Sequence, residues 1–265
     1  MAFSPNGRTL VTGSSDHTAR LWDVGAPILL SPPSDVIDMV AFSPDGRTVA
    51  TGNRDGVARL WDVATHQLIA TLTGHDNAVL GVAFSPDGRT LATTSVDHTA
   101  KLWNVATHQL LTTLKGHTNT VNAVAFSPDG RTLATTSTDD TAKLWDVATH
   151  QLITTLTGHL AEVDTVAFSP DGRTLATGSA DDTVKLWDVA THQLLATLTG
   201  HINNVNGVAF SPYGILATGS TDHTVRLWDL DTTRVTDRLC HIIGAPSRAD
   251  WARLIPDLPY QPSCR

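Results

Sequence analysis

Cysteine is almost absent from this sequence, which has only Cys240 and Cys264 among 265 residues, both near the C-terminus. No disulfide framework can therefore hold the main part of the chain together, and we expect both thiols to be reduced rather than paired. Long hydrophobic runs are also absent, since no stretch approaches the roughly 20 apolar residues of a membrane-spanning helix. The first residues lack the charged and then apolar pattern of a secretory signal. We expect a cytoplasmic protein with no membrane association.

Positive charge is scarce and dispersed. Lys and Arg together number 18 against 26 Asp and Glu, which gives a formal net charge of −8, and basic residues form no run. Binding to a phosphate backbone depends on clustered Lys and Arg, so no nucleic acid partner is expected. Helical periodicity is missing from residues 1–241. Gly, Ser, Thr and Asp instead recur every few residues, which favours short strands joined by tight turns. The sequence predicts an all-β fold.

The chain does contain a repeat. The tetrapeptide Ala-Phe-Ser-Pro recurs at one spacing of 39 residues and four of 42, with its phenylalanine at Phe3, Phe42, Phe84, Phe126, Phe168 and Phe210. Each copy continues through a Thr-rich stretch and an Asp-containing turn to a tryptophan, at Trp22, Trp61, Trp103, Trp145, Trp187 and Trp228. A further apolar segment leads to Gly-His and the next copy. A period near 42 is typical of a propeller or solenoid, and each period accommodates four strands.

The turn between the first two strands of each copy has a local physical basis. In residues 85–88, Ser-Pro-Asp-Gly, the proline fixes φ, the aspartate can accept bonds from its own backbone, and the glycine adopts positive φ without strain. The Asp-His-Thr or Asp-Asp-Thr step between the second and third strands acts similarly. Each copy is thus predicted to form antiparallel hairpins.

Together, Gly-His, Val-Ala-Phe-Ser-Pro-Asp-Gly, a Ser/Thr-rich strand, the turn Asp and the closing Trp-Asp resemble the WD-repeat family of bacterial type. The resemblance covers most of the chain. It implies a β-propeller of six four-stranded antiparallel blades around a channel, with the first strand of each unit innermost and the fourth outermost. We expect the first blade to be truncated, because its copy begins inside the first strand.

Four units carry His, Thr, Asp and Trp at matching offsets, which one could interpret as a hydroxyl–His–Asp catalytic triad. The resemblance implies instead a structural network in which indole, hydroxyl, imidazole and carboxylate bond one another. An active site rarely occurs in four copies, and neither a Gly-x-Ser-x-Gly elbow nor a phosphate loop accompanies these residues. We assign the structural role to His75, Thr93, Asp97, Trp103, His117, Thr135, Asp139, Trp145, His159, Thr177, Asp181, Trp187, His201, Thr218, Asp222 and Trp228.

Other polar residues of the repeat give no sign of a metal or cofactor site. The twelve histidines lack the clustering at two to five residues that metal ligands show. A basic residue also stands two positions before each tryptophan. We expect the stem of each to pack on the blade and the charge to extend into solvent, at Arg20, Arg59, Lys101, Lys143, Lys185 and Arg226.

Comparison of the copies locates the face that differs from blade to blade. The segment after Gly-His and the Asp turn lie on one side of an antiparallel blade, the top face, whereas the Ser-Pro-Asp-Gly turn lies on the bottom face. The bottom is uniform, with Val-Ala-Thr-His-Gln-Leu unchanged in four copies. Positions flanking the turn Asp vary, as at Arg54 and Ala180. The alternative explanation is drift after a recent duplication, but drift alone should scatter differences over both faces. We predict a partner-binding site on the top face at Asp76, Asn77, Ala78, Thr118, Asn119, Thr120, Leu160, Ala161, Glu162, Ile202, Asn203 and Asn204.

The two ends of the chain depart from the repeat. Met1 stands where later copies have Val, and a GTG codon read as a start would explain this, so we expect a miscalled start within a longer protein. Residues 242–265 form a tail, in which residues 247–254 are predicted to be a short helix. The propeller should span residues 1–241, with a last strand around residues 234–240. We expect a closed ring with its weakest seam at blade 1, or an open arc.

The predicted function is a scaffold or sensor that binds a protein or peptide on its top face and does no chemistry. Acidic top-face residues favour a basic partner surface: Asp35, Asp38, Asp76, Glu162 and Asp164. The tail resembles those of bacterial signalling proteins in which the propeller follows a kinase or a NACHT-type ATPase domain. Two alternatives stay open: an enzyme that uses Asp38 or Asp164 in the channel, and a structural spacer.

Overall fold

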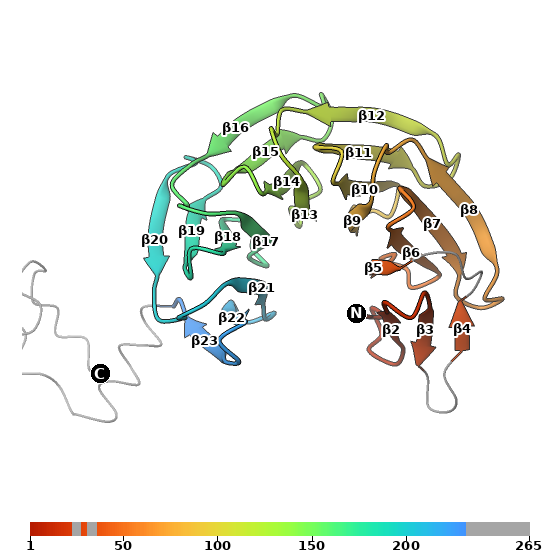
Figure 1. The fold of residues 1–265 in the computed structure, drawn as a ribbon, viewed down its shortest axis with the longest axis horizontal. Helices are drawn as coiled ribbons and strands as arrows, with labels where there is room; N and C mark the ends of the chain where they lie inside the picture. Colours follow the sequence, from red (N-terminus) through yellow and green to blue (C-terminus); the bar gives the residue numbers. More distant parts are fainter. Residues whose placement is uncertain (23–27, 31–35, 232–265) are drawn as a thin grey trace, which may run out of the picture.

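The computed structural model describes residues 1–22, 28–30 and 36–231. These residues form six antiparallel sheets connected by turns, without a helix among them. Figure 1 shows the sheets as blades that follow one another in chain order around a central opening. The prediction of an all-β propeller with six blades is confirmed.

Each blade takes one copy of the repeat, with its strands in sequence order. Blade 1 consists of β1 (Ala2–Phe3), β2 (Leu10–Gly13), β3 (Ala19–Trp22) and β4 (Ile28–Leu30). Blade 2 consists of β5 (Ile37–Phe42), β6 (Thr48–Asn53), β7 (Val57–Asp62) and β8 (Leu68–Thr73). Blade 3 consists of β9 (Val79–Phe84), β10 (Thr90–Ser95), β11 (Thr99–Asn104) and β12 (Leu110–Lys115).

The second half of the ring repeats this order. Blade 4 consists of β13 (Val121–Phe126), β14 (Thr132–Ser137), β15 (Ala142–Asp146) and β16 (Leu152–Leu156). Blade 5 consists of β17 (Val163–Phe168), β18 (Thr174–Ser179), β19 (Val184–Asp188) and β20 (Leu194–Leu198). The described part of blade 6 consists of β21 (Val205–Phe210), β22 (Ile215–Ser220) and β23 (Val225–Asp229).

The Ser-Pro-Asp-Gly turn closes the inner hairpin of a blade with a repeated set of hydrogen bonds. In blade 3 the Ser85 amide donates to the Thr90 carbonyl at 2.8 Å, and the Thr90 amide donates to Ser85 Oγ at 2.9 Å. Ser85 Oγ in turn donates to Asp87 Oδ1 at 2.6 Å. Gly88 has a φ of 71°, which glycine adopts without steric cost. The turn residues therefore hold the innermost strand against its neighbour.

Neighbouring blades pack through one repeated apolar interface. Small and leucine residues of one blade face leucine and tryptophan residues of the next, and burial of this surface is the main stabilising contribution. Between blades 3 and 4, Ala92, Leu102 and Leu114 pack against Leu133 and Trp145, all at most 3% exposed. Equivalent clusters join the other consecutive blades. The tryptophan of each repeat is thus part of the contact between blades.

The described residues form an open arc, and among them the two ends of the arc lack this interface. Val225 and Leu227 of blade 6 are 73% and 72% exposed, whereas their equivalents in blade 5, Val184 and Leu186, are 1% and 5% exposed. At the other end, Trp22 of blade 1 is 39% exposed. Figure 1 shows the opening between blade 6 and blade 1. Of the two expected arrangements, the structure takes the open arc.

Histidine has a backbone role that the sequence analysis did not predict. Among the described residues, nine residues other than glycine have positive φ, and seven of the nine are histidine: His17, His66, His98, His108, His150, His192 and His223. Histidine is enriched in this left-handed conformation, as are Asn and Asp. The abundance of histidine therefore follows in large part from turn geometry.

Several predictions concern residues outside the described ranges. These are the strand around residues 234–240, the short helix at residues 247–254, the redox state of Cys240 and Cys264, and the top-face position of Asp35. Within the described ranges, no helix is long and apolar enough to cross a membrane.

Candidate protein-binding face

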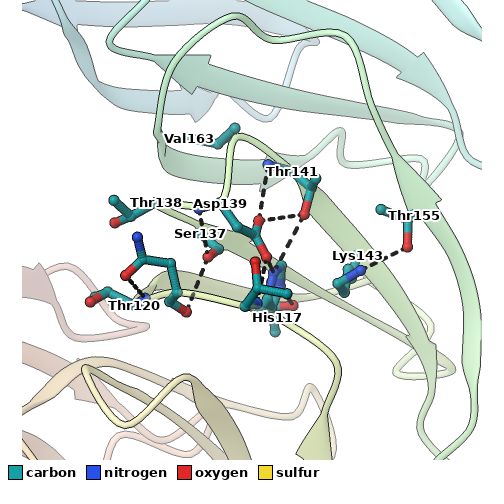
Figure 2. A network of polar contacts seen from close by, with 12 residues as sticks. His117, Thr120, Ser137, Thr138, Asp139, Thr141, Lys143, Thr155 and Val163 are labelled. Atoms are coloured by element: carbon teal, nitrogen blue, oxygen red, sulfur yellow. Dashed lines mark hydrogen bonds and ion pairs between the residues drawn. The ribbon is translucent and has the colours of Figure 1, made fainter.

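In blades 3 to 6 the His, Thr, Asp and Trp residues form one hydrogen-bonded chain, and Figure 2 shows His117 and Asp139 of the chain in blade 4. Trp145 Nε1 donates to Thr135 Oγ1 at 2.9 Å, and Thr135 Oγ1 lies 2.9 Å from His117 Nε2. His117 Nδ1 lies 2.9 Å from Asp139 Oδ2. A neutral imidazole satisfies every contact, because Nε2 then accepts from the threonine and the Nδ1 hydrogen is donated to the carboxylate. Blades 3, 5 and 6 contain the same contacts.

The protonation states follow from burial and bonding. Burial lowers the pKa of His117, which keeps the ring neutral, although Asp139 acts in the opposite direction. Burial acts to raise the pKa of Asp139, but hydrogen bonds from Thr141, the Thr118 amide and His117 lower it to about 2. The pair is therefore a neutral imidazole and an ionised carboxylate at neutral pH.

This arrangement lacks the accessibility that a catalytic triad requires. Thr93, Thr135 and Thr177 are 0% exposed, so no substrate can reach their hydroxyl groups. Each hydroxyl oxygen also accepts the indole hydrogen of the tryptophan on the adjacent strand. Blade 2 contains a variant in which Thr51 Oγ1 bonds Asn53 and Trp61. The geometry supports the structural role of the network.

The network also fixes the loops of the top face. Asp139 Oδ2 accepts a hydrogen bond from the Thr118 amide at 2.9 Å, and Asp181 Oδ2 accepts one from the Leu160 amide at 3.0 Å. The loop that begins after each Gly-His is therefore attached to the Asp turn of its own blade. Variable side chains thus stand on a backbone held by buried, repeated residues, as a preorganised binding surface requires.

The lysines before the tryptophans are more buried than expected. Lys101, Lys143 and Lys185 are 8%, 8% and 9% exposed, so the prediction that their charges extend into solvent is wrong. Lys143 Nζ donates to Thr155 Oγ1 at 2.8 Å, a contact visible in Figure 2. The bond explains the error, because Lys143 and Thr155 are paired on adjacent strands β15 and β16 and so bond within the blade.

A buried threonine next to the network gives a stability prediction. Thr136 is 0% exposed, and among the described residues its Oγ1 has no hydrogen-bond partner. Because a buried unpaired hydroxyl is costly, we expect Thr136→Val to raise the free energy of unfolding by about 1 kcal/mol. Urea denaturation measures this change.

The adjacent residue is the matched control. Thr135→Val deprives Trp145 and His117 of their partner, and it should lower the free energy of unfolding by about 2 kcal/mol. Opposite signs for the two variants support the hydrogen-bond assignment. Destabilisation by Thr136→Val would show that its hydroxyl has a partner.

Acidification should destabilise the protein through the network histidines. Burial lowers the pKa of His75, His117 and His159 below the ordinary value of 6.5, so the unfolded chain binds protons that the folded chain does not. Stability contributed by these groups is present above pH 6.5 and is lost as the pH falls through 6.5 toward their lowered values. Urea midpoints should therefore change little between pH 7.5 and 6.5 and decrease more between pH 6.5 and 5.5.

One carboxyl group acts in the opposite direction over this range. Burial and the neighbouring Glu162 raise the pKa of Asp164 to about 6, so Asp164 costs stability when it is ionised. Acidification below pH 6 removes that cost and partly offsets the effect of the histidines. Asp164→Asn should therefore make the loss of stability on acidification steeper than in the native protein. A urea midpoint that does not depend on pH in either protein would contradict the neutral state inferred for the network histidines.

The residues predicted for partner binding differ in exposure. Leu160 and Ile202 are 88% and 82% exposed. Ala78, however, is only 8% exposed, and its carbonyl accepts the Val96 amide at 3.0 Å, so we leave it out of the surface. Thr120, Ala161, Glu162 and Asn204 are half-buried, and the exposed remainder are Asp76, Asn77, Thr118, Asn119 and Asn203.

The structure brings together polar residues of the top face that the sequence analysis named separately. Arg54 Nε donates to both carboxylate oxygens of Asp38, at 3.3 and 3.0 Å. Asn122 Nδ2 lies 3.4 Å from Asp164 Oδ1 in the next blade. Asp38, Asn122 and Asp164 belong to β5, β13 and β17, the strands of their blades that lie nearest the central opening in Figure 1.

The bottom face contains two depressions that the sequence analysis did not predict. One, of about 380 Å³, lies between blades 5 and 6 and includes Tyr213, which is 79% exposed. The other, of about 360 Å³, lies between the Ser-Pro-Asp-Gly turns of blades 4 and 5. The departure from the repeat at Tyr213, where four copies have Asp and the first has Asn6, was the signal available in the sequence.

The described residues contain no group of three or more His, Cys, Asp or Glu that could hold a metal ion.

Comparison with known proteins agrees with this architecture. No curated protein matches the chain. The profile of the family described as WD domain, G-beta repeat matches residues 1–23, 30–62, 66–104, 108–146, 150–188 and 192–229. The match covers most of the chain and one copy per blade, so the protein belongs to the WD-repeat family.

Proposed function

We propose that this protein is a non-catalytic scaffold or sensor that binds a protein or peptide partner through its top-face loops. The observation that carries the proposal is the contrast between the two faces. Bottom-face turns repeat almost unchanged, whereas exposed top-face residues differ between blades on loops held by the buried network. WD-repeat propellers typically mediate protein–protein interaction, which supports the same function.

The proposal includes a cellular setting. We place the propeller in the cytoplasm as part of a larger bacterial signalling protein, after a kinase or NACHT-type ATPase domain. The resemblance of residues 242–265 to the tails of such proteins supports this setting. The net charge of −8 and the dispersed basic residues support a partner other than nucleic acid or membrane.

The function predicts a specific result for top-face substitutions. The variant Asp76→Ala, Thr118→Ala, Glu162→Ala and Asn203→Ala changes one residue in each of four blades. We expect it to lose at least tenfold in affinity for peptides selected on the native protein from a phage-displayed random library, because these side chains form the contact surface. Interferometry on immobilised protein measures the affinity.

A bottom-face variant in the same part of the ring serves as the control. It combines Gln67→Ala, Gln109→Ala, Gln151→Ala and Gln193→Ala, all exposed positions. We expect this variant to keep the native affinity and both variants to keep the native melting temperature. Equal loss of binding in both variants would contradict a top-face site and would favour the spacer alternative.

A further inference from the structure

The top face of blades 5 and 6 has two exposed aliphatic residues at equivalent loop positions. Leu160 and Ile202 are 88% and 82% exposed, where blades 3 and 4 have Asp76 and Thr118. Their amides donate to Asp181 and Asp222 at 3.0 and 3.2 Å, so both positions are fixed. Exposed leucine and isoleucine on fixed loops can bury apolar surface on a partner without the cost of ordering a loop.

Two acidic residues follow Leu160 in the chain. Figure 1 shows the chain running inward from β16 to β17; Leu160 and Glu162 lie in this loop, and Asp164 is the second residue of β17. Within the described ranges the structure shows no ion pair to either carboxylate. The raised pKa of Asp164, caused by burial and by Glu162, is consistent with a charge that lacks a counterion.

Blade 2 shows how the same carboxylate position is neutralised. Asp38 is the second residue of β5, as Asp164 is of β17. Arg54 Nε lies 3.0 Å from Asp38 Oδ2 and 3.3 Å from Oδ1, and the Arg54 side chain is 60% exposed. At the position of Arg54, blade 5 has Ala180. The fifth blade therefore retains the acid and lacks the arginine.

The backbone around the two positions is the same. The Arg54 amide donates to the Val36 carbonyl at 3.1 Å, and the Ala180 amide donates to the Glu162 carbonyl at 2.9 Å. The strand pairing also corresponds, with Ile37 opposite Asn53 and Val163 opposite Ser179. A guanidinium group could thus bond Asp164 in the geometry that Arg54 adopts toward Asp38.

We propose that the top face of blades 5 and 6 binds a peptide segment of a partner whose arginine pairs with Asp164 and whose neighbouring aliphatic side chains pack on Leu160 and Ile202. The partner's arginine takes in blade 5 the place that Arg54 takes in blade 2. Arginine fits better than lysine, because its planar group donates to both carboxylate oxygens. This proposal rests on the proposed function and specifies its partner chemistry.

Ala180→Arg tests the proposal, because an arginine of the protein itself would then occupy the position beside Asp164 that the partner's arginine is proposed to take. In this variant the new side chain should pair with Asp164 as Arg54 pairs with Asp38. Peptides from a phage-displayed library of random 12-residue segments, selected on the full native chain, should contain arginine beside aliphatic residues. Their affinity should fall about tenfold or more for Ala180→Arg and equally for Asp164→Asn. Leu160→Ser with Ile202→Ser should weaken the same peptides without changing their preference for arginine over citrulline.

The outcomes separate the two proposals. Selected peptides that bind Ala180→Arg and Asp164→Asn as tightly as the native protein, but not the four-residue top-face variant, would overturn the arginine site and keep the proposed function. Peptides that show equal affinity for the top-face and bottom-face variants, or a selection that yields no binding peptide, would overturn both. Ala180→Glu is a second control: it adds bulk at residue 180 without a positive charge, so it should not reproduce the loss of binding seen with Ala180→Arg, and an equal loss in both variants would count against the pairing with Asp164.

Discussion

Replacement of Trp145 by alanine is expected to lower the free energy of unfolding by about 4 kcal/mol, the largest effect of any single substitution considered. The indole is 3% exposed and lies in the cluster that joins blades 3 and 4. Its removal leaves a cavity between blades and also deprives Thr135 of the indole hydrogen bond. Urea denaturation followed by circular dichroism measures the loss.

Trp22 provides a control within the same chain. Its Nε1 donates to Thr12 Oγ1 at 2.9 Å, the same bond at the same length as that of Trp145 to Thr135. Trp22, however, is 39% exposed at the open end of blade 1. We expect Trp22→Ala to cost about 1 kcal/mol, because it removes the hydrogen bond and little contact between blades. Equal costs would show that the indole stabilises its own blade rather than the junction.

Asp139→Ala is expected to lower the free energy of unfolding by about 3 kcal/mol. The Asp139 carboxylate accepts hydrogen bonds from His117 Nδ1, the Thr118 amide, the Thr141 amide and the Thr141 hydroxyl. Its side chain is only 7% exposed, so truncation leaves buried donors without an acceptor. A second effect should follow at the surface, because the loop that carries Thr118 loses its attachment. Amide exchange at Thr118 should therefore accelerate.

The next residue in the chain is the control for this variant. Asp140 is exposed and has a φ of 64°, and asparagine accepts that conformation as readily as aspartate. Asp140→Asn should change the free energy of unfolding by less than about 0.5 kcal/mol. If Asp139→Ala melts at the same temperature as Asp140→Asn, the hydrogen bonds of the carboxylate contribute no net stability.

Sequence spacing was sufficient to predict contacts within a blade. Antiparallel register places Thr135 opposite Lys143 and Leu133 opposite Trp145 whenever the repeat keeps its length. The His117 network was implied by the resemblance to WD repeats. The same regularity made six blades predictable. These features depend on short-range geometry, which a residue pattern encodes directly.

Features that depend on a second blade or on side-chain depth were not predictable. Ala78 lies in a variable loop and was therefore predicted to be exposed, but it directly precedes β9 and is buried. The sequence shows that blade 2 has Arg54 where blade 5 has Ala180. That Arg54 forms an ion pair with Asp38, and that Asp164 lacks the equivalent partner within blade 5, could be recognised only from the structure. The open end of blade 6 was likewise left as an alternative, because residue patterns do not specify how tightly an arc closes.

The exposed face of blade 6 bears on how such a protein can gain blades during evolution. Val225 and Leu227 present the surface that Val184 and Leu186 present to the following blade inside the arc. Each unit therefore carries both halves of its own junction. A tandem duplication in the gene would give a new unit a complementary surface at once, with no compensating substitution elsewhere. Arrays built this way can change length in evolution one copy at a time.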